Sequence, residues 1–363
     1  MSEQVVMVTG AAGFLGQHII RELQENAPEV SRIVALDRLP YLKQFDYADR
    51  VEVDKVQCDI CDCEAVMHAL QGVTCVIHCA GVVSVSLFPD DLGLRKVNIE
   101  GTVNLVASCL EQGVRNFIYT STVDAMVTTQ PCHNLDESSP LPDPSQLIFS
   151  AYGSSKQRAE QYVLACNESQ IPKGNKMYSV VLRPTVMYGE LDPHFIPAIL
   201  QNARKGMLMR IGDGEARNQS TYAGNVAWAH VCAMRTLANP ETRRNIAGQV
   251  FFITDDTPVL NTFDFCETFV KSRGYEISSF KIPFKLLYYL LCIVQGFLWF
   301  LGPFIEINLK STRNVIKYIN EEHTFNGNNA REMMEYQPKY DYKESLSRSI
   351  LYYDTLIPHK SQL

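Results

Sequence analysis

The chain has 363 residues, of which 46% are hydrophobic and 20% charged, and its formal net charge is −7. This length supports a large domain with a substantial core and a smaller second region. The acidic balance and the lack of a basic run exclude nucleic acid as an expected partner. No secretory signal pattern precedes the first predicted strand, so the 11 cysteines are expected to be reduced thiols facing the cytosol. No metal site is predicted from them.

A glycine-rich turn follows the first predicted strand, over residues 5–8, and precedes a helical pattern over residues 14–23. Three glycines at three-residue spacing in this context are typical of a dinucleotide-binding loop. The first permits the tight turn, the second lets the backbone approach a pyrophosphate, and the third allows close helix–strand packing. The predicted cofactor contacts of this turn are Gly10, Gly13, Phe14, Leu15 and Gly16.

The second predicted strand, over residues 33–36, ends in Asp37, about 20 residues beyond the glycine turn. A carboxylate at this position can accept a hydrogen bond from the adenosine ribose 2′-hydroxyl and repel a 2′-phosphate. The sequence therefore predicts NAD as the cofactor, although Arg38, the next residue, could accept a phosphate.

Strand and helix patterns then alternate, which predicts an α/β fold with a doubly wound parallel sheet. Binding groups in such a sheet lie at the carboxyl ends of the strands. His78, inside an apolar strand, is interpreted as a packed core histidine. Candidate binding residues at later strand ends are Asp59, Ile60, Ala80, Gly81, Ser121 and Thr122. The expected strands cover residues 51–57, 73–79, 116–120 and 177–182, and the expected helices cover 63–70, 94–112 and 150–161, with a loop over 131–145.

Beyond residue 185 the alternation loosens. Short apolar segments over 207–211 and 250–253 alternate with a helix over 226–237, which predicts a smaller substrate-binding lobe. The predicted division is a nucleotide-binding domain over 1–185, the lobe over 186–282, an apolar segment over 283–306, and a helical region over 307–363 that packs on the main fold.

Residues 286–305 contain no charged side chain. About 20 residues of helix span about 30 Å, the thickness of a hydrocarbon core. A buried core helix is the alternative, and Gln295, Gly302 and Pro303 favour it. A core helix usually keeps a polar face, which this segment lacks, so contact with a membrane is predicted. If the C-terminal region packs back on the main domain, the segment lies on the membrane or dips into it.

Tyr152 and Lys156 lie four residues apart in a predicted helix and so share one of its faces. An ammonium group beside the phenol would lower the phenol pKa from near 10, which would make Tyr152 a usable general base. Thr122, at the end of a central strand, could hydrogen-bond the substrate oxygen. An exposed helix face is the alternative interpretation of this spacing.

On these residues the chain resembles the extended short-chain dehydrogenase/reductases and, more narrowly, the 3β-hydroxysteroid dehydrogenase/Δ5-Δ4 isomerase family. The opening motif matches residues 9–16, and the active-site triad matches Thr122 (serine in most members), Tyr152 and Lys156. The family also carries an apolar membrane segment where residues 286–305 lie. Three downstream motifs resemble residues 183–189, 222–230 and 252–258.

The resemblance implies a Rossmann-type fold and NAD-dependent oxidation of a steroid or sterol 3β-hydroxyl to the 3-ketone. Tyr152 would act as the general base, Lys156 would hold the ribose hydroxyls and tune Tyr152, and Thr122 would orient the substrate oxygen. Asn98 matches a family asparagine of a proton relay, with a helix-surface role as the alternative.

Bifunctional members of the family also move the double bond, with an acid–base pair near the motif that contains Asp255 and Asp256 here. The tyrosine that serves as isomerase acid in those members falls at Phe251, and phenylalanine cannot donate a proton. Isomerisation would therefore need a substitute such as Tyr275.

Three alternatives remain open. The first is a decarboxylating 4-carboxysterol 3-dehydrogenase, because its β-keto acid product loses carbon dioxide readily. The second is a nucleotide-sugar epimerase or dehydratase on the same fold, which the apolar segment disfavours. The third is a non-enzymatic NAD-sensing protein, which the intact triad disfavours.

The predicted partners are the steroid or sterol substrate and membrane lipid, while a homodimer stays open. The predicted location is the endoplasmic reticulum membrane, with the catalytic domain facing the cytosol and the mitochondrial membrane as the alternative.

Overall fold

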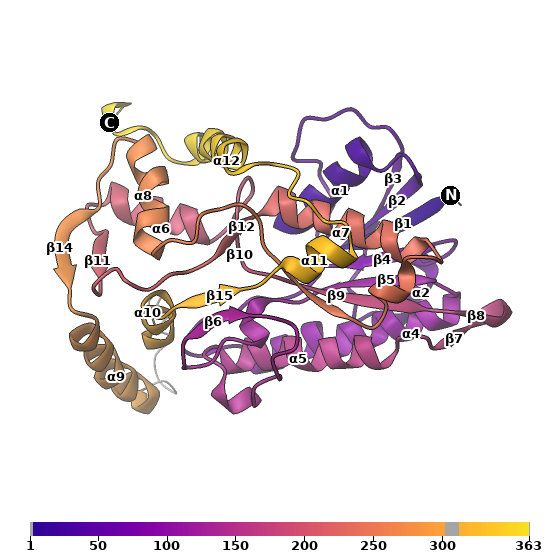
Figure 1. Ribbon diagram of the computed structural model, residues 1–363, viewed down its shortest axis with the longest axis horizontal. Helices are drawn as coiled ribbons and strands as arrows, with labels where there is room; N and C mark the ends of the chain where they lie inside the picture. The colour runs from indigo at the N-terminus through magenta and orange to yellow at the C-terminus, as the bar shows by residue number, and fades with distance from the viewer. Residues whose placement is uncertain (1–2, 302–311, 363) are drawn as a thin grey trace.

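The computed structural model describes residues 3–301 and 312–362. At its centre a seven-stranded sheet has the order β13-β9-β5-β4-β1-β2-β3, and all neighbouring strands run parallel (Figure 1). This confirms the predicted Rossmann-type parallel sheet. The strands are β1 (Gln4–Thr9), β2 (Val30–Asp37), β3 (Glu52–Gln57), β4 (Cys75–His78), β5 (Asn116–Thr120), β9 (Tyr178–Pro184) and β13 (Val250–Ile253).

Both faces of the sheet are covered by helices, which explains why its inner strands are largely apolar runs, while the edge strand β3 carries charged residues. Along β1, Val6 and Val8 pack in the cluster that holds the apolar sides of α1 and α7. Met7, between them, points to the other face and packs with α2, α4 and α5. These helices are α1 (Phe14–Asn26), α2 (Cys63–Ala69), α4 (Thr102–Gln112), α5 (Ser150–Ala165) and α7 (Ala223–Ala238).

The helix predicted over 94–112 is not uniform. It consists of α3 (Asp91–Leu94), a π-helical segment (Arg95–Gly101) and α4. A Cβ at Gly101 would lie 2.7 Å from the Ile60 side chain, so the segment packs closely on the end of β3. The π-helical turn holds Asn98 in a buried position, as such turns often do at functional sites.

Residues 186–282 do not form a separate lobe throughout. The segment over 250–253 is β13, which pairs with β9 at the edge of the main sheet, and α7 packs on α1. The expected loop over 131–145 contains β6, which pairs with β15 from the C-terminal region. The short paired strands are β6 (Cys132–Leu135) with β15 (His323–Phe325), β7 (Gln170–Ile171) with β8 (Asn175–Lys176), β10 (Val186–Tyr188) with β12 (Ser220–Tyr222), and β11 (Met209–Ile211) with β14 (Ser278–Ile282).

The remaining helices lie mostly in the second half of the chain. They are α6 (Phe195–Arg204), α8 (Thr262–Ser272), α9 (Phe284–Leu301), α10 (Arg313–Ile319), α11 (Asn328–Met333) and α12 (Tyr342–Leu356). Short 3₁₀ turns occur at Val123–Ala125, Pro144–Gln146, Pro172–Gly174, Arg243–Asn245 and Lys360–Gln362.

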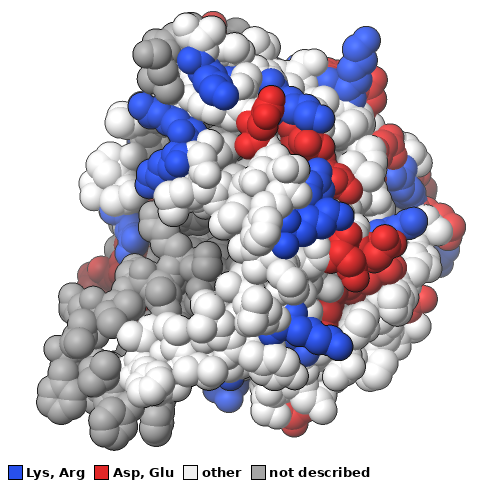
Figure 2. All heavy atoms as spheres, turned by 90° about the vertical axis from the view of Figure 1, so that its left-hand side faces the viewer, with Lys and Arg blue, Asp and Glu red and all other residues white. Residues whose placement is uncertain are grey.

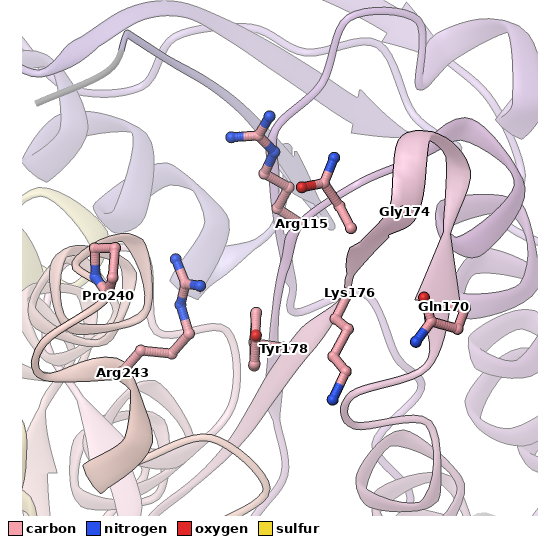
Figure 3. A pocket seen from close by; sticks show the side chains of 8 residues that line it. Arg115, Gln170, Gly174, Lys176, Tyr178, Pro240 and Arg243 are labelled. Carbon is pink, nitrogen blue, oxygen red and sulfur yellow. The ribbon is translucent and has the colours of Figure 1, made fainter.

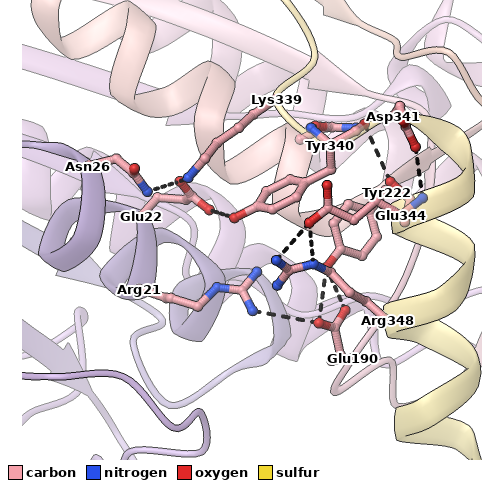
Figure 4. Close-up of polar contacts among 12 residues, drawn as sticks. Arg21, Glu22, Asn26, Glu190, Tyr222, Lys339, Tyr340, Asp341, Glu344 and Arg348 are labelled. Atoms are coloured by element: carbon pink, nitrogen blue, oxygen red, sulfur yellow. Dashed lines mark hydrogen bonds and ion pairs between the residues drawn. The ribbon is translucent and has the colours of Figure 1, made fainter.

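A buried polar network joins the C-terminal region to α1 (Figure 4). The carboxylate of Glu22 accepts hydrogen bonds from Lys339, at 2.9 Å, and from the hydroxyl of Tyr340. Beside it, Arg21 lies 3.5 Å from Glu190, and both side chains are almost fully buried. Charges that are buried must be paired, so this network fixes the C-terminal region against the nucleotide-binding layer.

Within the described ranges, no helix is long and apolar enough to cross a membrane. Helix α9 contains most of the predicted apolar stretch, and residues 302–305 of that stretch lie outside the described residues. One face of α9 nevertheless exposes large hydrophobic side chains at helical spacing. They are Leu286, Tyr289, Leu290, Ile293 and Phe297.

A buried ion pair fastens α5 to the central sheet. Arg183 on β9 donates to Glu160 on α5 through Nε, at 3.0 Å, and through a second guanidinium nitrogen. Removing one partner of such a pair leaves an uncompensated buried charge. We expect Glu160→Ala to lower the free energy of unfolding by about 3–5 kcal/mol, measured by urea denaturation.

The control for this variant is Glu168→Ala, because Glu168 pairs with Lys176 at the surface. Exposed pairs contribute at most about 1 kcal/mol. Equal losses in the two variants would show that the buried pair does not hold α5 in place.

Candidate cofactor and catalytic site

The glycine turn lies at the carboxyl ends of β1 and β4, where the strand order reverses. Gly10 has a φ of +70°, and a Cβ there would lie 2.8 Å from the backbone nitrogen of Ala80. A Cβ on Gly16 would lie 2.1 Å from the carbonyl oxygen of Gly10. Glycine is therefore required at both positions, one for conformation and one for the close approach of α1 to the turn.

The amino end of α1 is open to a ligand. Its N-cap residue is Gly13, which provides no capping side chain, and the first turn contains no acidic residue. The first backbone N–H groups of a helix lack partners within the helix and attract anions. This cradle fits the pyrophosphate of a dinucleotide. Phe14 and Leu15 begin the helix, with Phe14 half-buried and Leu15 buried.

Asp37 is tied to the glycine turn by hydrogen bonds. Its carboxylate accepts the backbone N–H of Ala12, at 3.0 Å, and that of Leu39, at 2.9 Å. Each carboxylate oxygen keeps a further lone pair, so a ribose hydroxyl can still bind there. The position of Asp37 beside the turn fits the sequence-based interpretation.

The other predicted cofactor residues line the same edge of the sheet. Asp59 is exposed, and its carboxylate accepts the backbone N–H of Cys61. Ile60 is buried against α4. Gly81 follows Ala80 and lies near Lys156, since a Cβ on Gly81 would be 3.9 Å from the ammonium nitrogen.

Helix α5 packs tightly on the turn that follows β5. A Cβ on Gly153 would lie 2.6 Å from the carbonyl oxygen of Asp124, and Gln157 donates to the carbonyl of Ala125 at 2.7 Å. This contact brings the buried Tyr152 side chain close enough to Thr122 for the Thr122 hydroxyl to lower the Tyr152 pKa. Two residues separated widely in sequence are thus adjacent in the site.

Lys156 is buried behind Tyr152. Its ammonium group donates to the carbonyl of Thr120, at 2.7 Å, and lies 4.4 Å from the ring centre of Tyr119. Burial lowers the pKa of Lys156 to about 8, while Glu160 and Cys79 oppose this change. An ammonium group has three N–H donors, so two remain for the hydroxyls of a bound ribose.

The expected lowering of the Tyr152 pKa by Lys156 stays a prediction, because other groups dominate the pKa of Tyr152 in this structure. Burial raises the pKa of Tyr152 above its ordinary value, and the nearby Asp124 carboxylate raises it further. The interaction with Thr122 is the one that lowers it. Lys156 is not among the groups that shift the Tyr152 pKa, and one of its N–H groups donates to the Thr120 carbonyl.

Sequence reasoning missed Asp124, which lies two residues beyond Thr122. The Thr122 hydroxyl donates to its carboxylate at 3.1 Å and accepts its backbone N–H at 3.2 Å. Burial raises the pKa of Asp124 to about 6. The signal was present in the sequence, because Asp124 lies only two residues beyond Thr122, at the carboxyl end of β5.

Asn98 is buried, which excludes the helix-surface alternative. Its amide accepts the N–H of Val82, at 2.7 Å, and donates to the Val82 carbonyl and to Ser155 on α5. Asn98 therefore joins the loop after β4 to the catalytic helix. His78 is confirmed as a packed core histidine, since both ring nitrogens contact threonine hydroxyls and burial lowers its pKa to about 3.

The residues expected near an isomerase site form hydrogen bonds, an ion pair and core contacts elsewhere in the fold. Asp255 accepts hydrogen bonds from Asn225 and from the backbone of Tyr222, while Asp256 pairs with Arg331 at the surface. Phe251 packs in the core cluster of α1 and α7. The hydroxyl of Tyr275 donates to the Pro358 carbonyl, far along the chain from the triad.

A basic cavity of about 420 Å³ lies elsewhere, at the amino ends of β5 and β9 (Figure 3). Its cations are already engaged in part: Arg243 donates to the carbonyls of Leu237 and Ala238, and Lys176 pairs with Glu168. The cavity is on the opposite edge of the sheet from the glycine turn, so it is separate from the catalytic site.

The fold and this site define an extended short-chain dehydrogenase/reductase. A model of the 3-beta hydroxysteroid dehydrogenase/isomerase family matches residues 7–286, and the chain belongs to that family.

Solved structures of low identity share the fold. The protein gox2253 is 23% identical with a TM-score of 0.73, over 99% of this chain and 100% of its own. The dTDP-glucose 4,6-dehydratase DesIV from Streptomyces venezuelae, with NAD and TYD bound, is 20% identical with a TM-score of 0.70, over 97% of both chains. The UDP-glucuronic acid 4-epimerase from Bacillus cereus, in complex with NAD, is 18% identical with a TM-score of 0.70, over 97% of this chain and 99% of its own. The NAD in the last two agrees with the expected cofactor.

The contacts of Asp37 generate a prediction about cofactor choice. Asp37→Asn removes the charge that attracts a ribose hydroxyl and repels a 2′-phosphate. We expect the dissociation constant for NAD to rise about 10-fold, because hydrogen bonds to charged groups contribute about 1.5–3 kcal/mol, and the constant for NADP to rise less. Isothermal titration calorimetry measures both.

Asp54→Asn is the matched control, since Asp54 pairs with Arg32 on the sheet away from the turn. An unchanged ratio of the two affinities in Asp37→Asn would remove the assigned role of Asp37.

Proposed function

We propose that the protein oxidises the 3β-hydroxyl of a steroid or sterol to a 3-ketone, with NAD as the acceptor. The observation that carries this proposal is the family match over residues 7–286, together with a site in which Thr122, Tyr152 and Lys156 gather beside the glycine turn. Family membership supports the reaction class, and the intact triad supports an active enzyme.

The bound NAD would supply the nicotinamide that takes up hydride. The residues of this chain would bind the cofactor and remove the proton from the substrate hydroxyl. The amino end of α1 would bind the pyrophosphate, and Lys156 would hold the ribose with its two remaining N–H groups. Tyr152 would take the proton from the substrate hydroxyl as general base. Thr122 already donates to Asp124, so it would contact the substrate hydroxyl as an acceptor.

The loop after β4 supports an apolar substrate. It begins at Gly81 and is held against α5 by Asn98. Beyond that anchor it exposes Val83, Val85 and Phe88, with 62%, 40% and 44% of their surfaces accessible. Large apolar side chains exposed next to a catalytic site are typical of contacts with an apolar ligand. A sugar nucleotide would gain little from them.

The second candidate is a nucleotide-sugar epimerase or dehydratase, because solved structures of this fold carry those activities. These enzymes are too distant in sequence to decide the substrate. Oxidation of a ring hydroxyl with the same triad would start either reaction, so the substrate must be tested directly. A 4-carboxysterol remains the alternative within the steroid class.

We also propose that the exposed face of α9 contacts a lipid bilayer in the plane of the membrane. The face is extended by Phe280 on β14 and Met207, which are 64% and 63% exposed. Figure 2 shows this end of the molecule, where both basic and acidic side chains lie around an uncharged area. Apolar side chains flanked by lysines, here Lys281 and Lys285, are typical of interfacial helices. The location at the endoplasmic reticulum stays a prediction.

The function is tested by NADH formation with detergent-solubilised protein. We expect NADH with a 3β-hydroxy-Δ5 steroid and none with UDP-glucose or dTDP-glucose. Tyr152→Phe should reduce kcat at least about 100-fold, since a positioned acid–base group contributes about 10²–10⁴-fold. NAD affinity should stay unchanged, because the substitution removes only a hydroxyl.

Tyr162→Phe is the control, because Tyr162 lies on the same helix at the margin of the core. NADH with a sugar nucleotide alone would favour the second candidate. Chromatography of the steroid product also tests isomerisation: Phe251 predicts a 3-keto-Δ5 product, corrected for spontaneous conversion in a sample without enzyme.

The membrane proposal predicts a loss of vesicle binding. Leu290→Glu combined with Ile293→Glu places two charges on the exposed face of α9, and charges in hydrocarbon are costly. We expect at least 10-fold weaker sedimentation with phosphatidylcholine–phosphatidylserine vesicles. Leu351→Glu is the control, since Leu351 is 69% exposed on α12. Equal binding by all variants would mean that α9 does not contact lipid.

A further inference from the structure

The first turn of α5, which carries Tyr152, has no side-chain cap of its own. Its N-cap residue is Phe149, whose side chain forms no capping hydrogen bond, and the turn contains no acidic residue. The first backbone N–H groups of a helix lack partners within the helix, and helix ends are the parts that open most easily. Tyr152 therefore depends on contacts from outside α5 to keep its phenol in place.

Helix α10 provides such contacts from the C-terminal region. The side-chain amide of Asn314 donates to the carbonyl of Ile148, at 2.8 Å. The ring of Tyr318 lies against the ring of Phe149, with 5.8 Å between the ring centres. Because Asn314 and Tyr318 are four residues apart in one helix, both lie on the face of α10 that meets the residues leading into α5.

Ile148, at the entry to α5, is held through both of its backbone polar groups. Its N–H donates to the carbonyl of Val127, at 3.0 Å, just beyond the turn Val123–Ala125. Its carbonyl accepts from Asn314, and the residue is only 2% exposed. A buried carbonyl that loses its donor costs free energy, so this position is strongly determined. The entry to the catalytic helix is fixed between the end of that turn and α10.

Helix α10 is itself anchored. Thr312 caps its amino end by accepting the backbone N–H of Val315, at 3.2 Å, and Ile316 is 4% exposed. The ring of Tyr318 also lies against His323 of β15, with 4.6 Å between the ring centres. Since β15 pairs with β6, this support is tied to the strand that follows the triad threonine along the chain.

We propose that Asn314 and Tyr318 are positioning residues, which take the place of the missing cap of α5 and keep the Tyr152 phenol aligned with the substrate hydroxyl. The proposal rests on the oxidation proposed above. Proton transfer depends on this alignment, because a displacement of about 1 Å can cost about 100-fold in rate. The match to the family model ends at residue 286, so this support lies beyond the matched part of the chain.

The first test is Asn314→Ala, which leaves the Ile148 carbonyl without its donor. We expect kcat for the steroid to fall about 10-fold, because Tyr152 is less well aligned, while KM and the dissociation constant for NAD stay unchanged. A higher KM with an unchanged kcat would show that Asn314 binds substrate directly, which would overturn the positioning role.

Asn320→Ala is the matched control. It removes a hydrogen bond of the same kind from the same helix, since Asn320 donates through its side-chain amide to the Ile316 carbonyl, at 2.9 Å. That bond stays within α10 and does not reach α5. We expect a similar loss of thermal stability with the wild-type kcat. Equal kcat values in Asn314→Ala and Asn320→Ala would show that Asn314 only stabilises α10, and the proposal would fail.

Tyr318 allows a second test by conservative substitution. Tyr318→Phe keeps the ring that lies against Phe149, so it should keep the wild-type kcat, whereas Tyr318→Ala should lower kcat about 10-fold. An equal fall in both variants would place the effect in the hydroxyl and contradict the role of the ring contact. If Tyr318→Ala does not fold, Tyr318→Phe and Asn314→Ala still decide.

A measurement without turnover separates this proposal from the proposed function. The Gly153 N–H closes the first turn of α5 onto the Phe149 carbonyl, at 2.7 Å. In the protein alone, amide hydrogen exchange at Gly153 should be about 10-fold faster in Asn314→Ala and unchanged in Asn320→Ala. If steroids are not oxidised but this exchange rises, the proposed function fails and the support by α10 stands. If the exchange keeps its wild-type rate, α10 does not hold the first turn and the proposal is wrong.

Discussion

The close contact between α5 and the turn after β5 is the constraint on which the site depends. Gly153 faces the Asp124 carbonyl so closely that any Cβ would collide with it. The Arg183–Glu160 pair holds the next turns of the same helix to β9. Because α5 is fixed at both points, Tyr152 meets Thr122, and Lys156 reaches the Thr120 carbonyl at the end of β5. Catalytic geometry here follows from backbone packing more than from the triad side chains themselves.

Much of the fold could be predicted from local pattern. The inner strands of the main sheet are buried on both faces, so each is a largely apolar run that stands out in the sequence, whereas the edge strand β3 is partly exposed and carries charges. The glycine turn could also be predicted, since Gly10 and Gly16 are required by contacts within a short stretch of chain. Residues 250–253 are predicted as a short apolar segment of the lobe, and their place in the main sheet is not predicted, because pairing with β9 is a long-range contact that a four-residue segment does not specify.

The sequence predicts which residues form the site, but it does not predict how neighbouring charges shift their pKa values. Tyr152 and Lys156 share a helix face, as their spacing requires, yet spacing does not reveal where an ammonium group points. Lys156 donates to a main-chain carbonyl, and the nearby Asp124 carboxylate raises the pKa of Tyr152. The π-helical turn that buries Asn98 has no simple sequence signature either, because it depends on how Gly101 packs against Ile60.

The C-terminal region contacts both the nucleotide-binding layer and the segment that follows the catalytic turn. Its residues pair with α1 through Glu22, and β15 pairs with β6 just beyond the catalytic turn. Tyr318 on α10 lies close enough to Asp124 to respond to its charge, and α10 also contacts α9. Helix α10 therefore contacts α9 and also carries a residue close to Asp124. The exposed apolar face of α9 and the surroundings of Asp124 are thus joined through a single helix, α10.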